Sequence, residues 1–340
     1  MNSLASTLNP KTLLEVCPFV SLEEAYYLKE LSLKLDFKIT HQNADFKLDT
    51  LEQGDLYVLL GGFLSAYLNR NESMLLEHIH THKIPYALLR PLQDSRDTNK
   101  ACFFLPYEIN TEVALLALLV RGVLERKDCL KGHILENLDV GYLSSESNMS
   151  EEELEELLDL MFNAKKVVLV LGNEITKHMH AQFLYTLCYE LQTHAHINIL
   201  QVPLASSLYS QSDLTPLKYN SINKELLKEL ALKEKITPYK PQLMAQDLNI
   251  LDQILEANGS FAYLACNTAK NPKLYFSKQF KIANRLSHSR ANVQILNKTL
   301  ECELKECPHL KGLIAILEGA FFETYPYTPI TFLSHSQGNL

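Results

Sequence analysis

Glycine is scarce in this 340-residue chain, which has only 11 of them. That is about half the ~7 % usual in proteins. Glycine lets a backbone approach a phosphate group closely, and neither glycine-bearing strand end, at Gly61 or at Gly172, continues as G-x-G-x-x-G or G-x-x-x-x-G-K-[ST]. The scarcity therefore disfavours a glycine-rich nucleotide cradle.

Positive charge is in deficit too, because 32 Lys and Arg residues face 40 Asp and Glu residues, a net charge of -8. A protein that binds phosphate backbones normally has the opposite excess, so we expect no nucleic-acid partner. The longest apolar run, residues 113–124, is broken by Arg121 and Gly122 and falls short of the ~20 residues that span a bilayer. The N-terminus shows no signal-peptide pattern. We expect a cytoplasmic chain without direct membrane insertion.

Clustered metal ligands and a nucleophile motif are missing as well. The seven cysteines include no C-x-x-C pair, which predicts reduced thiols and no iron-sulfur cluster in this chain. Histidines are grouped, but on a helix only His78 and His82 share a face, and a third and fourth ligand are not apparent. G-x-S-x-G is absent. The sequence thus predicts no catalytic, cofactor-binding or metal-binding residues.

Short apolar runs alternate with helical patterns, which predicts an α/β fold with mainly parallel sheets. Residues 55–91 and 166–203 each follow the order strand, turn, helix, strand, proline, and residues 261–296 form a weaker third copy. We expect the strands at 167–171 and 261–265 to share one sheet. The strand at 56–60 is expected in another sheet, with the strands near Ala87 and Phe103.

Helix starts are marked by capping residues. Ser21 with Glu24, and Ser150 with Glu153, have the capping-box spacing, and Asn110 or Thr111 precedes a helix at 112–126. Cys307-Pro308 predicts the start of a late helix. Apolar periodicity lapses over residues 131–149. We place a boundary there between two Rossmann-like lobes, residues 1–135 and 136–340.

Ligands of open α/β folds bind at the carboxyl ends of the strands. Two turns of this chain lie there, and they contain Gly61, Gly62, Phe63, Ser65, Gly172, Asn173 and Glu174. Phe63 and Leu64 fill the first turn with apolar bulk, and no basic residue follows within phosphate reach. We therefore interpret these turns as packing elements.

The order of these segments resembles the molybdopterin oxidoreductase superfamily over roughly residues 12–300. The segments TLLEVCPFVSLEEAYYLKELSLKL, GDLYVLLGGFLS through LLVRGVLE, and SESNMSEEELEELLDLMFNAKKVVLVLG have the order and spacing of its strands and helices. Within that superfamily, the chain is most similar to the molybdopterin-like part of the large iron-sulfur subunit of bacterial complex I, the NADH:quinone oxidoreductase.

Three family motifs are replaced in this chain. G-x-N-P is replaced by residues 61–64, D-P-R by Leu89, Arg90 and Pro91, and P-G-T-D by Ile109, Asn110, Thr111 and Glu112. The resemblance then implies a domain without molybdopterin. It predicts an accessory part of the complex I peripheral arm, bound to other peripheral-arm subunits that hold the iron-sulfur clusters and associated through them with the inner membrane. The alternative is a freestanding dinucleotide- or pterin-binding oxidoreductase domain.

Overall fold

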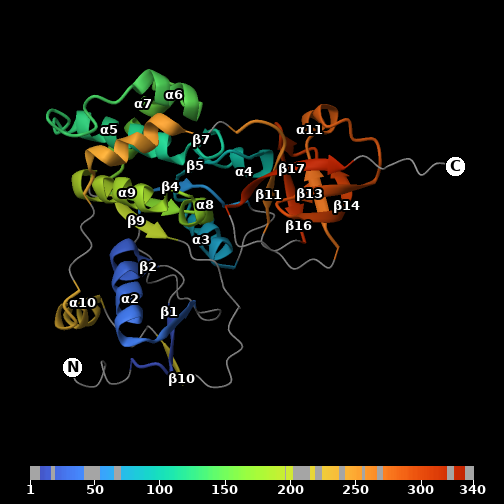
Figure 1. Cartoon of the computed structure of the whole chain (residues 1–340). Helices are drawn as coiled ribbons and strands as arrows, with labels where there is room; N and C mark the ends of the chain where they lie inside the picture. The colour runs from blue at the N-terminus through green and yellow to red at the C-terminus, as the bar shows by residue number, and fades with distance from the viewer. Residues whose placement is uncertain are drawn as a thin grey trace.

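The chain folds around a six-stranded sheet, a closed β-barrel and a small N-terminal unit (Figure 1). This is the architecture of a computed structural model, in which the sheet and barrel share a core of buried side chains at their contact. The residues that the structure describes are 8–16, 20–41, 54–64, 70–195, 197–201, 215–218, 224–236, 242–254, 257–265, 271–319 and 325–333.

The six-stranded sheet has the order β2-β9-β8-β4-β5-β7. Five neighbouring strands are parallel, and only the edge strand β2 is antiparallel to its neighbour. The strands are β2 (Val20–Ser21), β4 (Leu56–Leu60), β5 (Tyr86–Leu89), β7 (Phe103–Leu105), β8 (Val167–Leu171) and β9 (Asn198–Gln201). The predicted α/β class is confirmed.

Helices cover both faces of this sheet, which is why its central strands are apolar throughout. Along β4, Leu56, Val58 and Leu60 point to one face and Tyr57 and Leu59 to the other, and all five are buried. Helix α3 (Arg70–Thr81) packs on the Tyr57 face. The Leu56 face is covered by α5 (Glu112–Arg126), α6 (Val140–Ser147), α7 (Glu151–Asn163), α9 (Ala181–Ala195) and η3 (Ala245–Gln253).

The helix boundaries follow local capping chemistry. The Ser150 hydroxyl accepts the N–H of Glu153, and the Glu153 carboxylate accepts the N–H of Ser150, so the predicted capping box begins α7. Thr111 precedes α5 as expected, but its hydroxyl donates to the carbonyl of Glu108. Helix α2 (Leu22–Leu35) also forms, whereas the side chains of Ser21 and Glu24 lie outside those the structure describes.

Six strands form the closed barrel, in the order β11-β16-β12-β14-β13-β17. Alternate residues such as Val293 and Ile295 point into its apolar interior. Helix α11 (Lys278–Ala283) adds Phe280 to the same core. The strands are β11 (Phe261–Leu264), β12 (Lys273–Phe276), β13 (Arg290–Ile295), β14 (Lys298–Glu306), β16 (Ile314–Glu318) and β17 (Tyr327–Leu333).

The predicted distribution of strands between sheets is wrong. β4 and β8 pair directly, from Leu56 with Val167 to Leu60 with Leu171, while β11 belongs to the barrel. Residues 131–149 are not a polar link between sheets, because they include helix α6, which Asp139 caps and which packs on α5. The predicted boundary at residue 135 therefore falls between two adjacent strands of one sheet.

One further connection differs from the sequence prediction. Cys307 and Pro308 do not begin a helix but lead into β15 (Leu310–Lys311), which pairs with β6 (Gln93–Asp94) and ties the barrel to the sheet. The adjacent α4 (Ser95–Thr98) is capped by Asp94.

The N-terminal unit contains three parallel strands in the order β10-β1-β3, together with α2 and α10 (Lys224–Lys233). Leu14, Leu31 and Leu227 lie in its separate apolar core. The strands are β1 (Thr12–Val16), β3 (Lys38–His41) and β10 (Thr215–Lys218).

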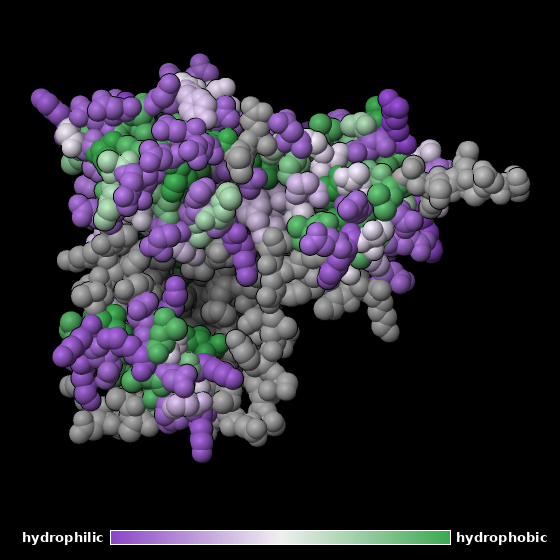
Figure 2. Space-filling view, in the orientation of Figure 1, coloured by the Kyte–Doolittle hydropathy of each residue, from purple (hydrophilic) through white to green (hydrophobic). Residues whose placement is uncertain are grey.

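The visible surface is mostly hydrophilic, with small hydrophobic patches between the charged side chains (Figure 2). Among the described residues, none of the helices is both long and apolar enough to cross a membrane.

Candidate functional site

The carboxyl edge of the parallel sheet is the candidate site, because ligands of open α/β sheets bind there. The barrel lies against this edge. Leu64, Leu92 and Ile109, which follow β4, β5 and β7, share one apolar cluster with barrel residues such as Tyr263 and Ile316. The barrel thus covers the strand ends, and the polar groups between the two units are buried.

The side chain of Glu174 fills the turn after β4. This residue lies in the short helix α8 (Asn173–Lys177) that follows β8, and it is fully buried. The N–H of Gly62 donates to Glu174 Oε1 at 2.7 Å. A methyl group on Gly61, whose φ is +80°, would overlap Glu174 Oε2. An internal carboxylate therefore binds the backbone donor that an anionic ligand would otherwise use.

Arg90 follows β5, and its guanidinium donates hydrogen bonds to other groups of the same chain. Its guanidinium is 0 % exposed and donates to the carbonyl of Leu92 at 2.9 Å, to the carbonyl of Phe63 at 3.1 Å and to Asp97 Oδ2 at 2.9 Å. Phe63 is also buried. This buried cation is thus held by two carbonyl oxygens and a carboxylate, and Asp97 neutralises its charge.

Glu112 begins α5 and contacts the segment that enters the last barrel strand. Its Oε1 accepts hydrogen bonds from the hydroxyls of Tyr325 at 2.5 Å and Tyr107 at 3.3 Å. Its Oε2 lies 3.5 Å from Nε2 of His178. Because His178 Nδ1 accepts the N–H of His180 at 3.0 Å, the neutral ring has its proton on Nε2, toward Glu112.

Burial dominates the electrostatics of this group. It raises the pKa of Glu112 and of Glu174 to about 7, although the Tyr325 hydroxyl and the Gly62 N–H favour the charged forms. Burial lowers the pKa of His178 to about 4. Glu112 Oε2, Glu174 Oε2 and His178 Nε2 are buried without a hydrogen-bond partner. The cluster can hold protons near neutral pH, and its side chains are shielded from solvent.

The pKa of Glu174 predicts how pH acts on stability. The carboxyl titrates near 4.5 in the unfolded chain and near 7 in the fold, so its stabilising protonation is complete below pH 4.5 and is lost as the pH rises through 7. Glutamine does not titrate. Relative to wild type, Glu174→Gln should therefore gain up to about 3 kcal/mol in free energy of unfolding between pH 4 and pH 8.

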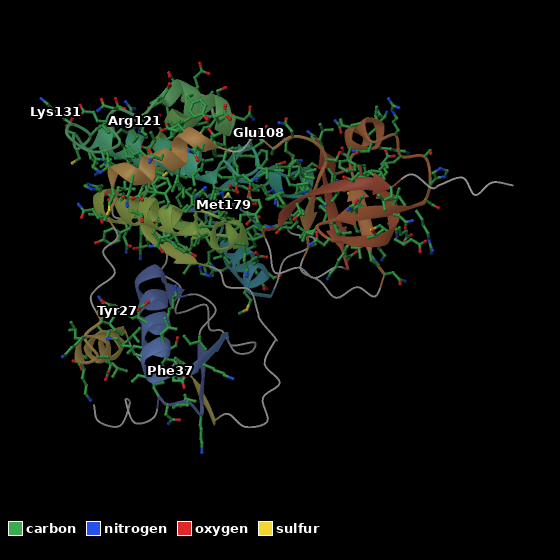
Figure 3. All side chains as sticks on the ribbon, viewed as in Figure 1. Tyr27, Phe37, Glu108, Arg121, Lys131 and Met179 are labelled. Atoms are coloured by element: carbon green, nitrogen blue, oxygen red, sulfur yellow. The ribbon has the colours of Figure 1, made fainter. Side chains whose placement is uncertain are left out.

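Urea unfolding at several pH values measures this difference. Glu108→Gln is the matched control, since Glu108 is an exposed glutamate between β7 and α5 (Figure 3); its profile should run parallel to that of wild type. His178 titrates with the opposite sign, but it is present in all three proteins and cancels. A pH-independent difference between Glu174→Gln and wild type would contradict the assigned pKa.

No group of three or more metal-ligating side chains occurs in the part of the chain that the structure describes. A pocket of about 230 Å³ does exist at the opposite, amino edge of the sheet. It lies beside the starts of β8 and β9 and the last residues of α7, and Lys127, Phe162, Lys165 and Ile197 are among its lining residues. This pocket is separate from the carboxyl edge.

The sequence places some of these groups correctly. Gly61, Gly62 and Glu174 meet at the sheet edge, with Arg90 and Glu112 from the replaced family motifs beside them. Ser65, and the side chain of Asn173, lie outside what the structure describes.

We did not predict the partners of Glu112 from the sequence: these are Tyr107 and His178, which are buried, and Tyr325, which is partly buried. Only His178 has a local signal, because it lies four residues after Glu174. Exposed Met179 next to it, labelled in Figure 3, gives no sign that His178 is buried.

Comparison with known proteins identifies no family for this chain. No family model matches the chain, and no curated protein matches it. Among solved structures it is similar to acetylene hydratase from Pelobacter acetylenicus, with 8 % identity and a TM-score of 0.42 over 94 % of this chain and 80 % of that chain. A likeness at this TM-score does not assign the fold.

Proposed function

We propose that this protein is a non-catalytic accessory component of the peripheral arm of a respiratory NADH:quinone oxidoreductase, in the role of the molybdopterin-like part of its large iron-sulfur subunit. One observation supports it most. The edge of the sheet where a cofactor would bind is filled by the chain's own groups, with the Glu174 carboxylate on the Gly62 N–H and Arg90 held by Asp97. Such an edge serves packing between the sheet and the barrel.

In this proposal the chain contributes surface and rigidity, and the electrons pass through other polypeptides that contain iron-sulfur clusters. The sheet unit corresponds to a Rossmann-like lobe of the molybdopterin oxidoreductase pattern, with the phosphate-binding turn closed by Glu174. Association with the inner membrane is indirect, through the assembly. The net charge of -8 is typical of a protein that does not bind nucleic acid or anionic lipid directly.

Co-purification tests the proposal. A tagged copy of the chain is expressed in its native host, membranes are solubilised in mild detergent, and recovered proteins are identified by mass spectrometry, with the untagged strain as control. We expect cluster-bearing subunits of the oxidoreductase to be recovered. Deletion of the chain should lower donor-dependent quinone reduction in membranes, because the arm assembles poorly.

The competing function, a freestanding dinucleotide- or pterin-binding oxidoreductase, predicts another outcome. The chain would be recovered alone, its absorbance spectrum would show a bound flavin, nicotinamide or pterin, and the isolated protein would turn over with that cofactor. Recovery alone together with such turnover would refute the accessory role.

A further inference from the structure

The end of helix α3 contains two histidines one turn apart. The ring centroids of His78 and His82 lie 4.3 Å apart with an interplanar angle of 41°. His78 is 5 % exposed, and both of its ring nitrogens are buried without a hydrogen-bond partner. Buried polar atoms without partners are rare and cost folding free energy.

His82 is held in the form that binds metals. Its Nδ1 lies 2.9 Å from the carbonyl oxygen of His78, so Nδ1–H donates to that carbonyl and Nε2 keeps its lone pair. Metal-binding histidines usually donate their second ring N–H in this way. In their neutral forms, both rings can offer a nitrogen lone pair.

The spacing of the rings fits chelation. Two imidazoles bound side by side on one ion, with metal–nitrogen distances of about 2.0–2.1 Å, have centroids roughly 4.5–5 Å apart. The observed centroid distance of 4.3 Å is close to that range. His82 is exposed and leaves one side of the pair open to solvent. The C-terminal end of a helix also carries partial negative charge, which favours a cation.

We propose that His78 and His82 form a two-histidine site for a borderline divalent transition metal such as Cu²⁺, Ni²⁺ or Zn²⁺. Water would occupy the remaining coordination positions of the ion. This site is independent of the role proposed above. Two imidazole ligands favour these ions over Mg²⁺ or Ca²⁺, and Cu²⁺ should bind most tightly.

Calorimetric titration of the tag-free full chain with CuCl₂, and then with NiCl₂, tests the proposal in a buffer that does not chelate metals. His82→Ala is the main variant because His82 is exposed, so its replacement leaves no cavity in the core. His80→Ala is the matched control: it lies on the same helix, is exposed, and its ring faces Tyr86 at 5.9 Å. Both variants lose one of the 12 histidines.

We expect one equivalent of Cu²⁺ to bind wild type and His80→Ala alike, and His82→Ala to lose about tenfold or more in affinity for that equivalent. The electron paramagnetic resonance spectrum of the wild-type Cu²⁺ complex should show coupling to two nitrogens. Unchanged affinity in His82→Ala, or equal losses in His82→Ala and His80→Ala, would overturn the assignment.

Discussion

Arg90→Ala is expected to lower the free energy of unfolding by about 3–5 kcal/mol, because breaking a buried ion pair removes one charge and leaves the other in a site built for a partner. The guanidinium is 0 % exposed, and its distance to Asp97 is 2.9 Å. The carbonyls of Phe63 and Leu92 lose their Arg90 donors as well. Folded proteins have a total free energy of unfolding of only about 5–15 kcal/mol. The variant should therefore unfold at a much lower urea concentration than wild type.

Arg290→Ala is the matched control for this variant. Arg290 also pairs with a carboxylate, Glu301, at 3.3 Å, but their side chains are 69 % and 64 % exposed. Exposed pairs contribute about 0.2–1 kcal/mol. Urea denaturation followed by circular dichroism compares the two losses. Losses of equal size would show that the Arg90 contacts do not stabilise the sheet edge.

Gly61→Ala is expected to lower the free energy of unfolding by about 2–5 kcal/mol, the sum of two physical effects. A non-glycine residue at a φ of +80° costs roughly 1–2 kcal/mol. The added methyl group would also overlap Oε2 of Glu174, and overpacking of a buried site adds about 1–3 kcal/mol. Both effects act on the turn that the Glu174 carboxylate fills.

Gly132→Ala separates the two effects. Gly132 has a φ of +76°, but among the described residues no atom beyond its chain neighbours lies within 4 Å of the added methyl group. It should therefore show the backbone cost alone, and the difference between the two variants measures the steric cost of crowding Glu174. If urea denaturation gives the same loss of unfolding free energy for both variants, the turn after β4 accommodates a methyl group without crowding Glu174.

Much of the sheet could be predicted from local pattern. β4 and β8 are continuous apolar runs of the kind that strands buried on both faces require, and Ser150 with Glu153 correctly predicts the start of α7. The barrel could not be predicted in the same way, because the hydrophobic pattern of its strands differs from that of the sheet strands. In β13, exposed Gln294 alternates with buried Val293 and Ile295, a half-buried pattern unlike the continuous apolar runs of the sheet.

The candidate site could be predicted only in part. Strand ends locate Gly61 and Glu174 at one edge, since parallel strands share a carboxyl edge. The contact between Gly62 and Glu174 joins residues 112 positions apart, and that between Glu112 and Tyr325 joins residues 213 apart. No local pattern encodes such contacts, because they follow from how the sheet and barrel pack.

The Tyr325 contact has a consequence for synthesis on the ribosome. Glu112 emerges long before Tyr325, which follows it by 213 residues. At about 5–20 residues per second, Glu112 waits roughly 10–40 s before the Tyr325 hydroxyl is synthesised. During that interval the apolar strand ends at Leu64, Leu92 and Ile109 have no barrel to cover them. We therefore expect a chaperone to contact this apolar edge on the nascent chain until the final strand is translated.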